Sequence, residues 1–178
     1  LVDQLGIENV ASFPARNARA LPGVGPNTRY LLAQPFLAET AMALEDRGAV
    51  RLDAMFPFGA EGTTDWLKAA AREFGVDELL FNRVIAPGRD RAKRAMDHAR
   101  AELKGKRISF LPDSQLEVPL ARFLSQEMGM EPVEVGTPYL HRAHLKNDLD
   151  LICDKARISE GQHVDRQLDR VREDRPDQ

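Results

Sequence analysis

Two hydrophobic periodicities alternate along this 178-residue chain. Residues 49–56 (AVRLDAMF) place apolar side chains at every second position, as a strand requires. Residues 36–47 instead space Leu37, Ala41 and Leu44 along one face of a helix, and Gly48 follows as a cap. Strands that alternate with helices are typical of βαβ units. The pattern therefore predicts an α/β fold with mainly parallel sheets.

The first half of the chain holds further expected elements. Residues 7–13 (IENVASF) indicate a strand, a long loop rich in Pro, Gly and Asn follows, and residues 30–34 indicate a short strand. A helix is expected to begin with Thr63 or Thr64 as its N-cap and to end before Gly75. Helices cover both faces of a parallel sheet, so inward strand side chains should be buried. Four such side chains are Val50, Leu52, Ala54 and Phe110.

A long helical region follows Gly75, and Pro87-Gly88 is predicted to break it. The apolar spacing of its second part ends near Lys104, where a new strand begins with RISF. We place a domain boundary there. The expected division is a domain over residues 1–84, a connecting helix over 85–104, and the first part of a second domain, truncated at its C-terminus, over 105–178.

The second domain repeats the helix–glycine–strand–loop–helix order of the first. A helix is expected over residues 117–128. It should start at Leu116 or Glu117, because Pro119 is tolerated only within a first helical turn. Residues 130–135 indicate a strand. A helix with a buried stripe (Leu145, Leu149 and Ile152) and a polar C-terminal helix complete the pattern.

Composition narrows the function classes. An apolar content of 43% with 30% charged residues is ordinary for a soluble globular protein, and no apolar run is long enough to span a membrane. The net charge of −3 argues against nucleic-acid binding. A single cysteine, Cys153, excludes a disulfide framework within the chain and favours a reducing, cytoplasmic compartment. The chain begins without Met, and residues 1–6 resemble the last turn of a helix, so we expect an internal fragment.

Few residues have the pattern of a catalytic site. The glycine-rich stretch PGVGPN (22–27) lacks the spacing of a phosphate loop and favours a surface turn. His141 and His144 have helical spacing, with Asp148 four residues further on, but two histidines without a third firm ligand favour an exposed helix start over a metal site. Cys153 ends the apolar stripe and is expected to be a small buried apolar group. Trp66 favours a core or interface anchor.

The strongest candidate site is the loop that follows the strand MEPVEV. Ligands of open α/β sheets lie outside the carboxyl ends of the strands. Tyr139 and Leu140 can supply an apolar wall there, Gly136 allows close backbone approach, and His141 can donate a proton or make a polar contact. The alternative is that Thr137 and His141 merely cap the next helix. The residues by themselves do not decide the reaction.

Several stretches together resemble one family. They are LPGVGPNTRYLLAQPFLAETAMALEDRGA, FPFGAEGTTDWLKAAAREFGV, KRISFLPDSQLE with PLARFL, VEVGTPYLHR and SEGQHVDRQLDRVREDRPD. The chain is similar through essentially its whole length to the middle part of the N subunits of light-independent (dark-operative) protochlorophyllide reductases, which are nitrogenase-like. The P-x-G…T loop is shared more widely among nitrogenase-like proteins. LPDSQLE, GTPYLHR and the SEGQ stretch are specific to this subunit.

The resemblance implies a nitrogenase-like fold of Rossmann-like domains and a place in bacteriochlorophyll or chlorophyll biosynthesis. It implies ATP-dependent, ferredoxin-driven reduction of ring D of protochlorophyllide to chlorophyllide a. The N subunit of that family pairs with a B subunit as a heterotetramer, and an L protein that binds ATP delivers electrons received from ferredoxin. A 4Fe-4S cluster is held by three cysteines of N and one carboxylate of B.

The resemblance assigns no metal ligand to this chain. The family's three cysteines lie upstream of the matching region and Cys153 corresponds to none of them, so we expect the chain alone to bind no cluster and to be inactive. The substrate-cavity candidates are Gly136, Thr137, Tyr139, Leu140 and His141. The implied location is the cytoplasm, or the plastid stroma in a photosynthetic eukaryote.

Other readings share the fold. Chlorophyllide reductase or a nitrogenase subunit has the same architecture and the PFGAEGTT-type loop, but is not expected to combine LPDSQLE with SEGQ. From a different class, a two-lobed ligand-binding module or a sugar-nucleotide transferase also uses paired Rossmann-like units. A transferase should show a diphosphate-binding loop, which the sequence lacks.

Overall fold

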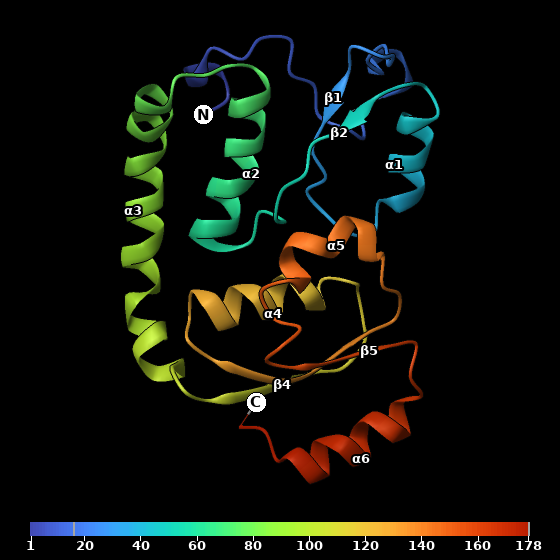
Figure 1. Ribbon diagram of the computed structural model, residues 1–178, viewed down its shortest axis with the longest axis vertical. Coiled ribbons are helices and arrows are strands. Elements are labelled where there is room, and N and C mark those ends of the chain that lie inside the picture. Colours follow the sequence, from blue (N-terminus) through green and yellow to red (C-terminus); the bar gives the residue numbers. More distant parts are fainter. Residues whose placement is uncertain (16, 178) are drawn as a thin grey trace.

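The computed structural model describes residues 1–15 and 17–177 as two α/β modules joined by a long helix (Figure 1). The first module begins with two short 3₁₀ turns, Asp3–Leu5 and Ala18–Ala20. Its regular elements are β1 (Arg29–Tyr30), α1 (Ala38–Glu45), β2 (Val50–Arg51) and α2 (Gly59–Glu73). β1 and β2 pair in parallel, which agrees with the predicted sheet type. No helix in the described residues is long and apolar enough to cross a membrane.

The first module contains less strand than the sequence pattern predicts. Residues 7–13 form no strand, and Val10 and Phe13 are exposed. β2 covers only two of the eight residues expected, and Val50 is 46% exposed. The prediction that Val50 is buried is therefore wrong, because a two-stranded sheet leaves strand positions without a covering helix. Leu52, Ala54 and Phe110 are half-buried.

The long helix α3 (Glu78–Leu103) runs through Pro87 without ending. The predicted break at Pro87-Gly88 is therefore wrong. Proline removes one helical hydrogen bond, but Pro87 itself is exposed and the helix is held on its other side by packing. There Phe81 and Ile85 join Leu67 of α2 in a core cluster, which Leu5 also enters. The packing of the apolar face of α3 therefore outweighs the tendency of proline to end a helix.

The second module is a three-stranded parallel sheet in the order β3-β4-β5. Its elements are β3 (Arg107–Phe110), α4 (Glu117–Gln126), β4 (Glu131–Thr137), α5 (Arg142–Leu149), β5 (Arg157–Glu160) and α6 (Val164–Asp174). Helices α4 and α5 cover one face of the sheet, and α6 lies on the other (Figure 1). The expected start of α4 at Glu117 is confirmed. Strand β5 has no counterpart in the predicted elements.

The main core lies between the sheet and helices α4 and α5. Val118 and Ala121 of α4, Val135 of β4, and Leu145 of α5 are each at most 1% exposed. Phe56 enters the same cluster from the first module and is 2% exposed. The two modules therefore share one hydrophobic core at their junction.

A buried ionic hub, formed by Arg122, Glu127 and Asp148, joins the modules. The Arg122 guanidinium donates to Asp148 Oδ1 at 2.9 Å and to Glu127 Oε1 at 3.1 Å, and its side chain is 1% exposed. It also crosses to the first module, where it donates to the carbonyl oxygens of Phe56 (2.9 Å) and Phe58 (3.1 Å). The Arg122 side chain thus connects α5, the end of α4 and the segment 56–62, which contains the PFGAEG loop (57–62).

The hub carboxylates bind backbone N–H groups of the same loop. Asp148 Oδ2 accepts from Phe56 N at 3.0 Å, and Glu127 Oε2 accepts from Ala60 N at 2.6 Å and from Glu61 N at 3.1 Å. Glu127 therefore caps the first turn of α2, which begins at Gly59. Burial raises the pKa of Asp148 above its ordinary value, although its bonds to Phe56 N and Arg122 oppose that effect.

The predicted N-cap of α2 at Thr63 or Thr64 is wrong. Both threonines lie inside the helix, where the Thr64 hydroxyl donates to the Ala60 carbonyl at 2.7 Å. A cap supplied by a residue 67 positions away from the N–H it binds leaves no local signal in the sequence. Trp66 is confirmed as a core anchor, because it packs against the α2–α3 cluster and its Nε1 donates to the Leu32 carbonyl at 2.8 Å.

A second polar cluster docks α6 onto the sheet. Glu134 of β4 is 1% exposed and accepts from Ser159 (2.6 Å), Arg170 (2.8 Å) and Arg157 (2.9 Å). Gln167, which is 0% exposed, approaches the same region. Burial disfavours the charge of Glu134, but the bonds from Ser159, Arg170 and Arg157 outweigh it and hold the pKa of this carboxyl below its ordinary value. The SEGQ stretch is thus tied to the sheet through charge.

Glu134 should make the docking of α6 sensitive to acid. Its folded-state pKa is depressed, so its contribution to stability is present above the unfolded pKa of 4.5 and is lost as the pH falls through the folded value. We expect Glu134→Gln to lower the free energy of unfolding at pH 7 by about 1–2 kcal/mol and to flatten its dependence on pH below 4. Urea unfolding at pH 7 and pH 3.5 measures both effects. An unchanged pH dependence in the variant would contradict this role.

Candidate functional site

The predicted loop follows the carboxyl end of β4. Gly136 and Thr137 close the strand, and the Thr137 hydroxyl donates to the Tyr139 carbonyl at 3.2 Å. Leu140 N donates to Glu160 Oε1 at 2.8 Å, which ties the loop to the last residue of β5. The loop is therefore held between two neighbouring strand ends, the position that the sequence argument uses.

The five candidate residues have different surroundings. Tyr139 is 52% exposed, His141 is half-buried, and Leu140 is buried in the core with 6% exposure. His141 occupies the N-cap position of α5, but its side chain makes no capping hydrogen bond. Of the five candidates, Tyr139 and His141 are thus the two with side-chain surface to offer a ligand. Their part in a substrate cavity is a proposal.

Gly136 serves the packing of α6. A Cβ at this position would lie 2.4 Å from Gln167 Nε2 and 3.0 Å from the Phe110 carbonyl oxygen. The close approach that the sequence suggests is therefore made by another side chain of the same molecule. Residue 136 and the SEGQ stretch belong to one packing arrangement.

Three aromatic rings line up from the loop into α5. The ring centroids of Tyr139 and His141 are 4.4 Å apart with an edge-to-face angle of 62°, and those of His141 and His144 are 5.5 Å apart with an angle of 24°. Edge-to-face and offset arrangements are favourable for aromatic pairs. The row leads from the exposed Tyr139 towards the first module.

His144 faces the first module. Burial, together with the positive charge of Arg51 and the neighbouring His141, lowers the pKa of His144 from its ordinary 6.5, so this imidazole is neutral at pH 7. Its Nδ1 is buried and has no partner among residues 1–15 and 17–177. Arg51 Nη2 donates to the Ala143 carbonyl at 3.3 Å and pairs with Asp53 at 3.0 Å. Arg51 therefore connects β2 to the start of α5.

Further polar side chains lie on the first-module side of His144. The Tyr30 hydroxyl donates to Glu45 Oε1 at 2.6 Å. Burial and this carboxylate both raise the pKa of Tyr30, so its phenol keeps its proton throughout the physiological range. Tyr30 and Arg51 are the last residues of β1 and β2. The strand ends of both modules thus meet in one junction, which we call the strand-end junction (Tyr30, Glu45, Arg51, Tyr139, His141 and His144).

Three of the six residues of this junction were not predicted from the sequence. Tyr30, Glu45 and Arg51 lie roughly 90–110 residues before the loop, and no local motif marks them. The strands predicted in the first module end at residues 34 and 56, so the strand-end rule applied to them misses Tyr30 and Arg51, where β1 and β2 actually end. Glu45 carries no such signal, because it lies at the end of α1.

The structure also describes two further groups of residues considered in the sequence. The first is the set His141, His144 and Asp148, for which the sequence favours an exposed helix start over a metal site. Asp148 turns into the ionic hub, so His141, His144 and Asp148 do not gather around one point. Among residues 1–15 and 17–177, no group of three or more His, Cys, Asp or Glu side chains is arranged to hold a metal ion. Cys153 is exposed, because α5 ends at Leu149 and the turn that follows carries Cys153 off the buried stripe. The expectation of a buried thiol is therefore wrong.

Comparison with known sequences places this arrangement in a family. A sequence profile of the nitrogenase component 1 type oxidoreductases matches residues 1–178. The chain belongs to this family. Membership in the nitrogenase component 1 type oxidoreductases agrees with the parallel α/β sheets seen in both modules.

Members of this nitrogenase component 1 type family with high identity share one name. The light-independent protochlorophyllide reductase subunit N of Rhodospirillum rubrum is 62% identical over 99% of this chain and 40% of its own length. A subunit N of Rhodopseudomonas palustris is 63% identical over 99% of the chain and 42% of its own length. That of Rubrivivax gelatinosus is 61% identical over 98% and 41%. The chain thus spans about two fifths of the length of these relatives.

Proposed function

We propose that this chain is part of the N subunit of a light-independent protochlorophyllide reductase. The proposal rests on one observation, an identity of about 60% sustained over 99% of the chain to subunits of that name. The reaction adds two electrons and two protons across the C17–C18 double bond of ring D and yields chlorophyllide a. The subunit works in ATP-dependent, ferredoxin-driven (bacterio)chlorophyll biosynthesis.

The partners follow from the same proposal. The subunit pairs with B as a heterotetramer, and the L protein binds ATP and passes on electrons from ferredoxin. A 4Fe-4S cluster would supply electron transfer within the complex. Such clusters need several thiolates, and this chain contributes one exposed cysteine, Cys153, so its residues do not fit a cluster site and we assign them no step through it. We place the complex in the cytoplasm, or in the plastid stroma of a photosynthetic eukaryote.

Within the complex we assign the strand-end junction a role at the substrate cavity. Tyr139 offers an exposed aromatic face for a large flat pigment, and His141 lies directly behind it. The neutral His144 and the protonated phenol of Tyr30 provide polar groups that carry no charge. The two charged residues of the junction already have partners, because Glu45 accepts from the Tyr30 hydroxyl and Arg51 binds Asp53 and the Ala143 carbonyl.

The proposal predicts the effect of two substitutions in the full-length N subunit assembled with B and L. His141→Ala and Tyr139→Ala should each lower turnover or pigment binding at least roughly tenfold, about 1.4 kcal/mol, while cluster content and assembly stay intact. The readouts are chlorophyllide formation and protochlorophyllide binding, both followed by absorbance. His98→Ala is the matched control, because His98 is 89% exposed on α3.

Three outcomes separate the parts of the proposal. A wild-type complex that forms no chlorophyllide would refute the assigned reaction. A working complex whose two variants keep full turnover would reduce the loop to scaffolding. A loss in His98→Ala equal to that in His141→Ala would show that the assay reports general damage.

A further inference from the structure

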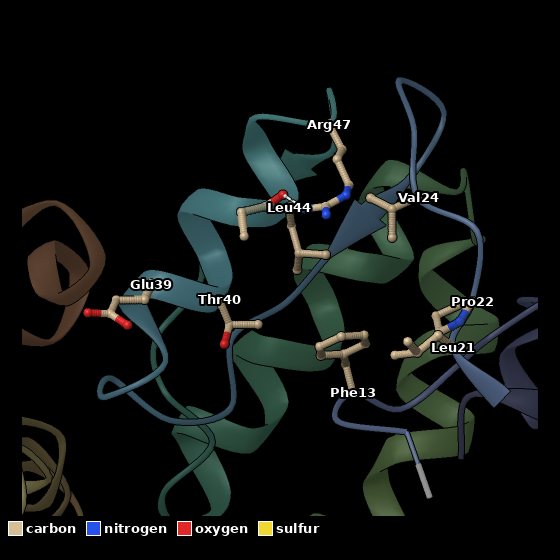
Figure 2. Close-up of a pocket in the computed structure, with 9 residues that line it drawn as sticks. Phe13, Leu21, Pro22, Val24, Glu39, Thr40, Leu44 and Arg47 are labelled. Carbon is tan, nitrogen blue, oxygen red and sulfur yellow. Dashed lines mark hydrogen bonds between the residues drawn. The ribbon is translucent and has the colours of Figure 1, made fainter. Parts of the chain in front are cut away.

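Tyr139 and His141 lie outside two hollows on the surface of the chain. The first hollow is a groove of about 500 Å³ between α1 and the loop that precedes β1 (Figure 2). The second lies at the amino end of β4, beside Met130. Neither contains a residue of the segment 138–141. Because neither hollow encloses Tyr139 and His141, the position of these side chains depends on how the segment itself is held.

The peptide group between Tyr139 and Leu140 is bonded at both of its polar atoms. The segment 138–141 forms no helix or strand, so no regular hydrogen-bond pattern fixes it. Its Tyr139 carbonyl accepts from the Thr137 hydroxyl at 3.2 Å, and the Leu140 N–H donates to Glu160 Oε1 at 2.8 Å. The carbonyl and the N–H of a planar peptide point in opposite directions, so the two bonds together fix the orientation of its plane. The direction of the Tyr139 side chain follows from that plane.

Glu160 holds this peptide group from the neighbouring strand. It is the last residue of β5 and lies opposite Thr137 in the parallel register. The next residue, Gly161, donates from its N–H to the Thr137 carbonyl at 3.0 Å, so the end of β5 is itself fixed to β4. The Glu160 side chain is exposed, and within residues 1–15 and 17–177 its carboxylate accepts no hydrogen bond other than that from Leu140. Its contacts within the described part of the chain therefore serve the loop and not the core.

We propose that Glu160 is a positioning residue for substrate binding and acts through Tyr139 and His141. By accepting from the Leu140 N–H, it fixes the backbone between the two aromatic side chains, whose ring centroids are 4.4 Å apart. A hydrogen bond to a carboxylate is stronger than one between neutral groups. A binding surface held in its bound conformation avoids the cost of being ordered when the ligand arrives. This inference rests on the proposed function, which supplies the pigment.

The test uses the full-length N subunit assembled with B and L. Glu160→Ala should raise the KM for protochlorophyllide at least roughly fivefold and change kcat less than about twofold, because the ground state and the transition state share the contacts that Glu160 positions. Glu160→Gln keeps an acceptor oxygen for the Leu140 N–H, so both constants should stay within about twofold of the wild type. Glu131→Ala is the matched control and should change neither constant, since Glu131 is exposed at the opposite end of β4.

A positioning role also predicts that the effects are not additive. In an N subunit that carries both Tyr139→Ala and His141→Ala, the side chains that Glu160 positions are absent. Adding Glu160→Ala to that variant should therefore raise KM by less than about twofold further. A residue that only stabilises the fold would show its full effect in both backgrounds.

Amide hydrogen exchange in the same complexes tests the bond without turnover. The Leu140 N–H should exchange at least roughly tenfold faster in Glu160→Ala than in the wild type, and at about the wild-type rate in Glu160→Gln. An unchanged exchange rate in Glu160→Ala would overturn the inference.

The kinetic outcomes separate this inference from the proposed function. If the wild-type complex is active, the inference is overturned by an unchanged KM in Glu160→Ala, by equal losses in Glu160→Ala and Glu160→Gln, or by full additivity with the loop variants. The proposed function stands in each of these cases. A KM rise in Glu131→Ala equal to that in Glu160→Ala would also overturn the inference, because the Leu140 bond would then not be the cause. A wild-type complex that forms no chlorophyllide would instead refute the proposed function, and hydrogen exchange would still decide whether Glu160 holds the loop.

Discussion

Replacing Arg122 by alanine should destabilise the chain by about 3–5 kcal/mol. The substitution leaves Asp148 and Glu127, which are 0% and 4% exposed in their side chains, without the cation that compensates them. It also removes one of the two donors of the Phe56 carbonyl, which then keeps only the Phe58 N–H at 2.7 Å. Removing one member of a buried ionic group is strongly destabilising because the remaining charges keep their desolvation penalty. Urea unfolding followed by circular dichroism measures the change.

The matched control for Arg122 is Arg91→Ala. Arg91 is exposed on α3, and the same chemical truncation there should change the free energy of unfolding by less than about 0.5 kcal/mol. A loss below 1 kcal/mol in Arg122→Ala would mean that the hub contributes no more than a surface ion pair. If Asp148→Ala, added to Arg122→Ala, restores part of the lost stability, the loss comes from the buried Asp148 carboxylate that Arg122 no longer compensates.

Gly62→Ala is the second change with a large expected effect, a loss of about 1–3 kcal/mol. A Cβ at residue 62 would lie 2.3 Å from Arg122 Nη2 and 2.5 Å from the Phe56 carbonyl oxygen. One of these contacts is with backbone, so the first turns of α2 must shift and the Arg122 bonds must lengthen. In an ordinary helix interior alanine is favoured over glycine, so the sign of this effect is specific to the hub.

Gly88→Ala provides the opposite case within the same molecule. Residue 88 lies inside α3, and a Cβ there would meet only Arg91 Nη2, at 4.0 Å. This substitution should stabilise the chain by roughly 0.5–1 kcal/mol. Thermal or urea unfolding of both variants side by side gives the comparison. Equal effects of the two substitutions would show that the PFGAEG loop tolerates a side chain at residue 62.

The sequence pattern predicts those elements whose stability is mostly local. Residues 117–126 carry a helical apolar face and a proline in the only permitted turn, and the start of α4 at Glu117 follows from them. The strand predicted over residues 130–135 ends two residues before β4 does. The parallel arrangement likewise follows from the order of helices and strands. These features need no knowledge of distant residues.

The features that the sequence does not reveal depend on contacts between distant residues. Glu127 caps α2 from the end of another helix, and α3 continues through Pro87 because its buried face packs on α2. Arg122 looks like any charged residue of an amphipathic helix, yet it is 1% exposed. At the candidate site the exposed loop residues are predictable, whereas Tyr30, Glu45 and Arg51 reach it only through the fold. The pattern of a single sequence does not indicate which distant residues contact each other in the fold.

The ionic hub has a consequence for exchanging parts between relatives. Gly62 and the Phe56 carbonyl belong to the first module, whereas Arg122 and Asp148 belong to the second. Arg122 is hydrogen-bonded to Asp148 and to the Phe56 carbonyl, and it leaves no room for a side chain at residue 62. Consider a chimera that joins the first module of one family member to the second module of another. Its two modules will pack correctly only when both parents carry these four residues. A substitution on one side of this contact therefore requires a compensating substitution on the other side. We expect the two modules to evolve together as a single unit.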